Sequence, residues 1–329
     1  MEQFKIKKEN DFVVVVFTKN RIYRLYKTLP RLPANNYDIV LLDESTTAKY
    51  QMEVKKLCEK YGLIYHGSGE QKEFIKQIKS PLIRKFVTNF SIPEWTLGYA
   101  RNYAVLLARN MGKKKILMMD NDIMIESPKD IKKMYHCMEH YQYVGARING
   151  MPDDSVVGQV YRTGGEIQKR YVSGSFLAFN LDKISNCFLN TYNEDWIWLF
   201  LDTNGNEVKT IIDVDQMTYD PFENTVQNAL FQENGEILWE GTYRSPKNKK
   251  EESLINPTFW EEILEHRKNQ IEYFDCLHIS KEVLPIVQKL KDVLLKYIQT
   301  LQPIYFAEIF QNYFNNLNDW RTLLEEVTT

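Results

Sequence analysis

The sequence predicts an α/β protein, with a mixed, mostly parallel β-sheet flanked by helices and a helical C-terminal extension. Three observations lead to this prediction. Short apolar runs alternate with amphipathic stretches of helical length through the first half of the chain, as in parallel βαβ units. These runs are continuous rather than alternating, which indicates strands buried on both faces. After Ser280, apolar residues recur every three or four positions, which is the period of a helix.

The first half of the chain contains the clearest elements. The β-branched run at 12–17 predicts the first strand, and the helix that follows it at 21–29 is ended by Pro30. The next expected elements are a strand at 37–42, a helix at 47–61, a short strand at 62–65, a helix at 97–111 and a strand at 116–119. Because ligands bind beyond the carboxyl ends of the strands in such sheets, the residues after each strand are candidate functional residues.

The second half is less regular. It predicts a strand with a glycine bend at 170–180, a helix at 193–201 and a strand at 209–213, and Pro285 and Pro303 interrupt the helical tail. We expect a main unit at 1–279, divided near residue 125, and an extension at 280–329. The simplest interpretation of the extension is a helical hairpin packed on the main unit. A homodimer contact through these helices is an alternative. A membrane contact is a poorer one, because Lys, Glu and Asp are mixed on the polar face.

Composition excludes several classes of protein. The 329 residues carry a formal net charge of −2, which argues against nucleic acid as a partner. No apolar run approaches the roughly 18 residues of a membrane span, and the N-terminus does not resemble a signal peptide. The four cysteines are scattered without a CxxC pair, so reduced core cysteines are expected. We therefore expect a cytoplasmic protein without a transmembrane segment.

Two acids directly follow the apolar strand at 116–119, in the tripeptide Asp120-Asn121-Asp122. Carboxylates two residues apart at the mouth of a buried strand repel each other. A hard cation relieves this repulsion, and oxygen ligands suit Mg²⁺ or Mn²⁺. Such a cation could in turn neutralise a diphosphate. The alternative is an ordinary turn, since Asp and Asn favour turns.

Several short motifs, in this order, resemble those of the family-two glycosyltransferases of the GT-A (Rossmann-like) fold. They are Thr18-Lys19-Asn20-Arg21, Asp43-Glu44-Ser45, Gly98-Tyr99-Ala100-Arg101-Asn102, Asp120-Asn121-Asp122 and Asn193-Glu194-Asp195-Trp196. The first two follow predicted strands and the third begins a predicted helix. The resemblance covers residues 12–200, with a looser match to residue 280.

The resemblance implies a nucleotide-sugar donor, with UDP as the expected nucleotide, and a role for each motif. Donor contacts are implied for Thr18, Asn20, Arg21, Asp43, Ser45, Gly98, Arg101, Asn102, Asp120 and Asn121. Asp120 and Asp122 correspond to the metal site for Mn²⁺ or Mg²⁺, which His278 would complete. Asp195 corresponds to the catalytic base, beside Glu194.

The chemistry of sugar transfer requires the same groups. An acceptor hydroxyl must lose a proton as it attacks the anomeric carbon, so a carboxylate within reach is needed as general base. The leaving nucleoside diphosphate needs a cation to stabilise its charge. The sequence therefore predicts an inverting, metal-dependent, hexosyltransferase-like enzyme. The acceptor stays open between a glycan, a peptide and a lipid-linked sugar, and we expect the segments at 147–155 and 171–176 to face it.

Each assignment has a structural alternative. Glu194 and Asp195 could be acids favoured by a helix dipole, Arg101 could pair with a surface acid, and His278 could be structural. Trp196 could stack on a sugar or pack in the core. A sugar-phosphate nucleotidyltransferase is an alternative activity, but the loop at 18–21 lacks the glycines of that class. A non-catalytic protein that binds a nucleotide sugar is the third hypothesis.

Overall fold

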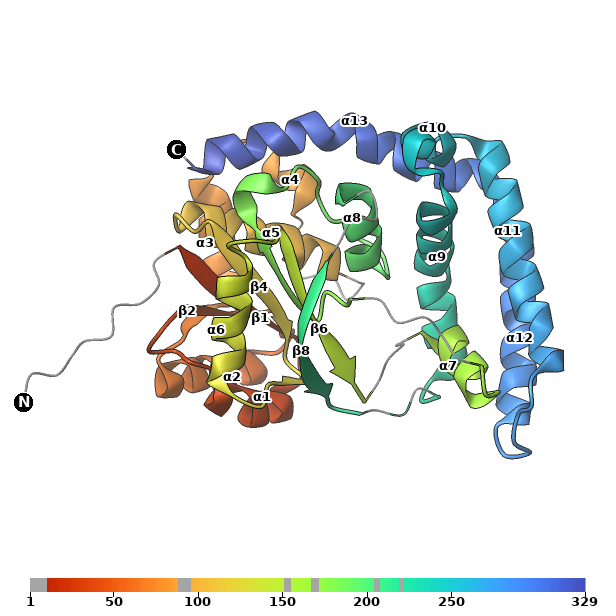
Figure 1. Cartoon of the computed structure of the whole chain (residues 1–329), viewed down its shortest axis with the longest axis horizontal. Coiled ribbons are helices and arrows are strands. Elements are labelled where there is room, and N and C mark those ends of the chain that lie inside the picture. The colour runs from red at the N-terminus through yellow and green to blue at the C-terminus, as the bar shows by residue number, and fades with distance from the viewer. Residues whose placement is uncertain are drawn as a thin grey trace, which may run out of the picture.

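A computed structural model of the chain describes residues 11–87, 96–150, 155–166, 172–203, 208–218, 220 and 222–328. The described strands form one sheet in the order β3-β2-β1-β4-β7-β6-β8-β5, with helices on both of its faces (Figure 1). The strands are β1 Phe12–Thr18, β2 Asp38–Asp43, β3 Ile64–His66, β4 Lys115–Asp120, β5 Ile123–Met124, β6 Tyr143–Asn149, β7 Phe176–Asn180 and β8 Lys209–Gln216.

Helices make up most of the rest of the described chain. The α-helices are α1 Ile22–Thr28, α2 Ala48–Tyr61, α3 Ser68–Gln77, α4 Ile83–Phe86, α5 Leu97–Asn110, α6 Pro128–Cys137, α7 Val156–Thr163, α8 Glu194–Asp202, α9 Thr225–Arg244, α10 Lys250–Leu254, α11 Pro257–Glu272, α12 Leu284–Thr300 and α13 Pro303–Thr328. Short 3₁₀ helices occur at η1 Leu29–Arg31, η2 Leu181–Lys183, η3 Lys247–Lys249 and η4 Tyr273–Cys276.

The sheet has a parallel half and a mixed half. Strands β3, β2, β1 and β4 are parallel, so their carboxyl ends lie at one edge, where Thr18 is in register with Asp43, and Phe17 with Asp120. Beyond β4 the pairs β4–β7, β7–β6 and β8–β5 are antiparallel, and β6–β8 is parallel. The predicted mixed, mostly parallel sheet flanked by helices is confirmed.

The continuous apolar run of β1 follows from its place between two cores. Val13, Val15 and Phe17 point into a core shared with α5, α8 and the C-terminal helices. Val14 and Val16 point into a second core, which α1, α2 and α6 cover. A strand buried on both faces needs apolar side chains at every position. The pattern therefore predicted this strand to within one residue of its end.

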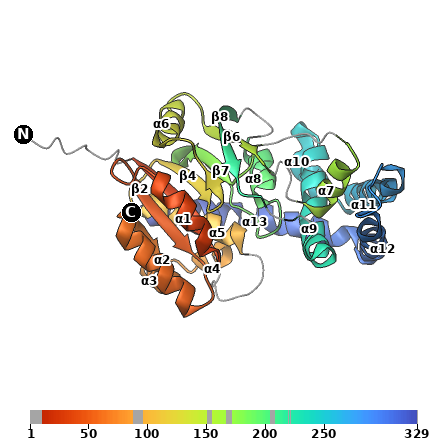
Figure 2. The same ribbon diagram turned by 90° about the horizontal axis from the view of Figure 1, so that it is seen from below.

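The helical C-terminal part is confirmed, and helices follow one another from Thr225 onward. The boundary near residue 280 stays a prediction. Helices α9, α11 and α12 gather at one end of the molecule, and α13 runs back from them along α5 (Figures 1 and 2). Gly235 lies in the middle of α9, a position at which glycine normally destabilises a helix. A Cβ at this position would lie 2.2 Å from the carbonyl oxygen of Tyr192, so the glycine allows α9 to approach the segment before α8.

The apolar faces of the last two helices are buried within the chain. On α12 these are Val287, Leu290, Leu294 and Ile298. On α13 they include Phe310 and Trp320. Both helices therefore pack on the rest of the chain, but they do not pair as the predicted hairpin: α12 packs on α9 and α11, whereas α13 contacts α11 and α5. The homodimer contact stays a prediction. None of the helices described is both long and apolar enough to cross a membrane. The four cysteines are not paired in disulfides.

Candidate active site

Hydrogen bonds join the loops that follow β1, β2 and β4. The Asn121 Nδ2 donates to Thr18 Oγ1 at 2.8 Å, and the Glu44 backbone N–H donates to the Thr18 carbonyl oxygen at 2.9 Å. The Asn20 backbone N–H donates to Ser45 Oγ at 3.0 Å. Three of the predicted motifs therefore meet at the carboxyl edge of the parallel strands.

The first two loops are shaped by their own polar side chains. Asn20 has a φ of +54°, a left-handed conformation that asparagine adopts more readily than most residues. Asp43 is fully buried and accepts from the Ser45 backbone N–H at 2.9 Å and from the Tyr65 hydroxyl at 3.1 Å. Burial raises the pKa of Asp43. Arg21 is exposed at the start of α1.

The two acids after β4 each present an oxygen without a hydrogen-bond partner among the described residues. These atoms are Oδ1 of Asp120 and Oδ1 of Asp122. The other oxygen of Asp122, Oδ2, forms an ion pair with Arg24 and accepts from Gln216 Nε2 at 3.5 Å. Burial and the charge of Asp120 raise the pKa of Asp122, and Arg24 opposes this rise. Two such oxygens suit a hard divalent cation.

Arg101 lies at the centre of the site. Its Nε donates to Glu194 Oε1 at 2.8 Å, and its Nη1 donates to the Gly174 carbonyl oxygen at 2.9 Å. Its Nη2 lies 3.9 Å from Asp120 Oδ1. The guanidinium is buried beneath this cluster and lies over the ring of Phe17, 5.3 Å from the ring centroid. Arg101 therefore joins the acids after β4 to the acids at the start of α8.

The pair Glu194 and Asp195 occupies the first turn of α8. Burial raises the pKa of Glu194 to about 8, and Arg101 opposes this shift. Asp195 accepts from the Gly174 backbone N–H at 2.5 Å and from the Trp196 backbone N–H at 2.9 Å. Burial also raises the pKa of Asp195, again opposed by Arg101. These backbone donors fix the orientation of the Asp195 carboxylate.

The start of α5 packs closely on the segment before α8 and forms hydrogen bonds with its backbone. A Cβ on Gly98 would lie 2.1 Å from the Leu189 carbonyl oxygen, so only glycine fits there. Asn102 accepts from the Phe188 backbone N–H at 2.7 Å and donates to the Phe188 and Phe86 carbonyl oxygens at 2.9 and 3.2 Å. The described contacts of Gly98 and Asn102 thus fix the backbone of the segment before α8. Their contact with the donor stays a prediction.

His278 does not join the two acids. It is exposed in the segment between η4 and α12. Within the described ranges, no three His, Cys, Asp or Glu side chains are grouped so that they could hold a metal. The structure therefore does not bring His278 together with Asp120 and Asp122, and the metal-binding role of the two acids stays a prediction.

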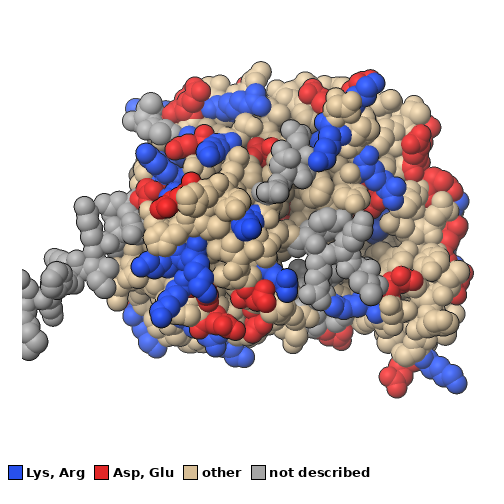
Figure 3. Space-filling model, viewed as in Figure 1, with Lys and Arg blue, Asp and Glu red and all other residues tan. Residues whose placement is uncertain are grey.

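The residues expected near the acceptor are only partly described. Trp196 packs against Trp239 of α9, with ring centroids 5.2 Å apart, which agrees with the core alternative for this ring. Of the two expected segments, residues 151–154 and 171 lie outside the described residues. Charges of both signs are interspersed on the face in Figure 3.

The sequence analysis missed two contributors to the site, Arg24 and Gly174. Arg24 lies 98 residues before its partner Asp122, on the buried side of α1. Gly174 contributes through its backbone, donating its N–H to Asp195 and offering its carbonyl oxygen to Arg101. The only available signal was the glycine bend in the predicted strand at 170–180.

Glu44→Gln is expected to stabilise the protein at alkaline pH. Glu44 Oε2 accepts from Thr96 Oγ1 at 2.8 Å, and burial raises the pKa of Glu44 from 4.5 to about 7. Below pH 4.5 the carboxyl is protonated in both the folded and the unfolded chain. As the pH rises toward 7 the unfolded chain ionises first, so the wild type loses stability and a glutamine does not.

Urea unfolding at several pH values measures this effect. The variant should exceed the wild type by on the order of 1 kcal/mol at pH 8, with the difference vanishing near pH 4. A difference that is constant with pH would show that folding does not change the pKa of Glu44.

Comparison with known proteins gave matches only among solved structures. No family model matches the chain, and no curated protein matches its sequence. Glucosyl-3-phosphoglycerate synthase from Mycobacterium tuberculosis, in complex with Mn²⁺, UDP-glucose and phosphoglyceric acid, is 10% identical, with 71% of this chain and 79% of that chain covered and a TM-score of 0.47. Its complex with Mg²⁺ and UDP is 12% identical, with 71% and 78% covered and a TM-score of 0.44.

A nucleotide-diphospho-sugar transferase from Desulfovibrio desulfuricans G20 is 11% identical, with 80% of this chain and 98% of that chain covered and a TM-score of 0.39. The activity proposed below rests on this chain's own residues.

Proposed function

We propose that this protein is an inverting glycosyltransferase that moves a sugar from a nucleotide sugar, expected to be UDP-linked, to an acceptor hydroxyl. The observation that supports this most strongly is the cluster around Arg101. It connects Asp120, at the carboxyl end of β4, with Glu194 and Asp195 at the start of α8. The acids suited to a metal and a diphosphate thus lie next to a carboxylate suited to act as base.

Asp120 and Asp122 are the residues that would hold Mg²⁺ or Mn²⁺. Each has a carboxylate oxygen without a hydrogen bond from any described residue. The bound ion would neutralise charge on the diphosphate of the donor. Thr18 and Asn121 fix the loop that carries these acids through their side-chain hydrogen bond.

Asp195 is the proposed general base. Its two oxygens accept backbone N–H groups, and each keeps acceptor capacity for an incoming hydroxyl. As the acceptor oxygen bonds to the anomeric carbon, Asp195 takes the hydroxyl proton. The bond from that carbon to the diphosphate oxygen breaks, and its electron pair leaves with the nucleoside diphosphate. One displacement inverts the anomeric configuration.

Incubation with Mn²⁺ and a panel of nucleotide sugars tests the proposed function. Release of the free nucleoside diphosphate, with water or an added sugar as acceptor, would support it. Release of pyrophosphate in the presence of a sugar phosphate and a nucleoside triphosphate would instead identify a nucleotidyltransferase. Tight donor binding without any product would identify a binding protein, and no binding of any nucleotide sugar would contradict the proposal.

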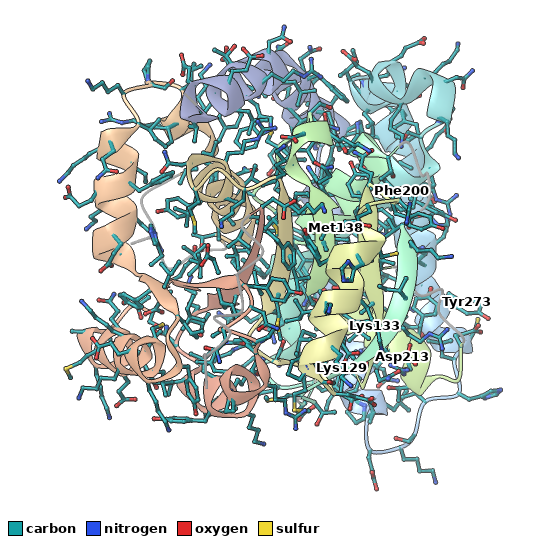
Figure 4. All side chains as sticks on the ribbon, turned by 60° about the vertical axis from the view of Figure 1, so that its left-hand side comes forward. Lys129, Lys133, Met138, Phe200, Asp213 and Tyr273 are labelled. Carbon is teal, nitrogen blue, oxygen red and sulfur yellow. The ribbon has the colours of Figure 1, made fainter. Side chains whose placement is uncertain are left out.

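Asp122→Asn is expected to weaken Mn²⁺-dependent binding of UDP by at least about tenfold, because it removes a charged metal ligand. The asparagine oxygen can still accept from Arg24, so the fold should be retained. Calorimetric titration with UDP, with and without Mn²⁺, measures the effect. Asp213→Asn is the matched control: Asp213 is exposed on β8 and pairs with Arg147 at 3.8 Å (Figure 4). Equal metal dependence in both variants would rule out Asp122 as a ligand.

A further inference from the structure

A buried ion pair ties helix α1 to the proposed metal site. Arg24 Nη1 pairs with Asp122 Oδ2, and their side chains are only 5% and 8% exposed. Arg24 Nε also donates to the Tyr23 hydroxyl at 3.1 Å, so the guanidinium is held from two sides. Arg24 lies one helical turn beyond Arg21 and belongs to none of the motifs identified in the sequence.

This ion pair reduces the number of carboxylate oxygens that are available to a cation. One oxygen of Asp122 already bears a positive partner, which leaves Oδ1 of Asp122 and Oδ1 of Asp120 for a metal. A second guanidinium, that of Arg101, lies 3.9 Å from Asp120. In a site so shielded from water, each positive charge repels an incoming divalent ion strongly. The described part of the chain adds no third His, Cys, Asp or Glu ligand to these two acids.

A bound nucleoside diphosphate would reduce the repulsion between the two guanidinium groups and the cation. Its phosphate groups bring negative charge that offsets the two guanidinium groups, and their oxygens supply the missing ligands. Mg²⁺ and Mn²⁺ are commonly bound by one or two carboxylates together with phosphate oxygens. The cation therefore gains most of its ligands only when the nucleotide is present.

We propose that Arg24 is a built-in counter-ion of Asp122 that keeps the nucleotide-free protein from binding a divalent cation tightly, so that the cation binds mainly together with the nucleoside diphosphate. The inference rests on the proposed function, because the same two acids hold the metal. It assigns to Arg24 a positioning and electrostatic role that no motif predicts.

Electron paramagnetic resonance of free Mn²⁺ measures this effect without any turnover. In the wild type at pH 8, saturating UDP should tighten Mn²⁺ binding to the protein by at least about tenfold, after subtraction of the Mn²⁺ that the same UDP binds without protein. Arg24→Gln should tighten Mn²⁺ binding in the absence of nucleotide by about tenfold or more, since it removes a unit charge beside Asp122. Arg24→Lys keeps the charge and should stay near the wild type.

The matched control is Arg31→Gln, on the neighbouring η1. Arg31 is exposed and donates to the Ile125 carbonyl oxygen at 3.0 Å, so this variant loses the same charge without touching Asp122. It should bind Mn²⁺ like the wild type. Weaker or unchanged Mn²⁺ binding in Arg24→Gln would assign Arg24 a purely structural role and overturn the inference.

The wild-type measurement keeps the inference testable should Arg24→Gln fail to fold, because equal Mn²⁺ affinity with and without UDP also overturns it. Failure of the transfer activity alone gives a different result, in which Mn²⁺ and UDP bind together as described while no nucleotide sugar releases its nucleoside diphosphate. Failure of all nucleotide binding would overturn both.

Discussion

Replacing Asp195 with asparagine is expected to lower turnover by roughly 10²–10⁴-fold, the usual contribution of a general base. The asparagine has the same shape, and its side-chain oxygen can still accept one of the two backbone N–H groups that Asp195 binds. Its NH₂ group faces the other N–H, so we expect a small local shift at the start of α8 and no larger change. The donor contacts proposed for the loops after β1, β2 and β4 are untouched. We therefore expect the affinity for UDP and Mn²⁺ to be nearly unchanged, which separates a catalytic defect from a binding defect.

Release of UDP from the active nucleotide sugar, together with calorimetric binding of UDP and Mn²⁺, measures both quantities. Asp275→Asn is the matched control for turnover, because it makes the same chemical change at an exposed residue of η4, away from the segments expected to face the acceptor. It should keep wild-type turnover. If Asp195→Asn transfers sugar at the normal rate, another group takes the proton, and Glu194 would be the next residue to replace.

The strands that were predicted best are those whose sequence pattern follows from burial alone. Strands β1, β2 and β4 are buried on both faces, so burial alone dictates their continuous apolar runs. The short runs around β6 and β8 carry exposed polar residues, and their pairing depends on distant neighbours. β8 was predicted only in part and β6 not at all. The helices from α9 to α11 were also missed, because α9 contains Gly235 and Gly241 and because polar residues are scattered along α10 and α11.

The site was predictable in its loops and not in its ion pairs. Thr18, Asp43 and Asp120 follow apolar strands, and a parallel sheet must bring the ends of such strands together. The pairs Arg24–Asp122 and Arg101–Glu194 join residues 98 and 93 positions apart, and no local sequence pattern predicts such pairs. His278 shows the converse case: it is a plausible residue type at a plausible place in the sequence, but the structure does not group it with Asp120 and Asp122.

The helical part is linked to the proposed base through Asn193. This residue begins α8 with a φ of +61°, and its Nδ2 donates to Glu236 Oε1 of α9 at 3.0 Å. Glu236 Oε2 in turn lies 3.5 Å from Nη1 of Arg267 on α11. The orientation of α8 therefore depends on packing far from the sheet, and Arg267 holds that packing together.

Arg267→Met is expected to lower the free energy of unfolding by about 3–5 kcal/mol, because it leaves a buried charge without its partner. The Arg267 guanidinium donates to both oxygens of Glu233, at 2.8 and 2.9 Å, and Glu233 is completely buried. Urea unfolding measures the loss. The double variant Arg267→Met with Glu233→Leu should recover most of it, since neither charge is then buried.

The matched control is Arg244→Met on α9, whose partner Glu240 lies one helical turn away and whose side chain is 44% exposed. Glu240 is 15% exposed and keeps a second partner, His266, at 3.3 Å, so the loss of Arg244 should cost at most about 1 kcal/mol. Through Glu236 and Asn193, the loss of Arg267 should also reduce turnover in conditions where the variant is fully folded. If Arg267→Met and Arg244→Met unfold at the same urea concentration, the buried pair does not hold α9 and α11 together, and the orientation of α8 must be set by apolar packing such as that of Trp196 on Trp239.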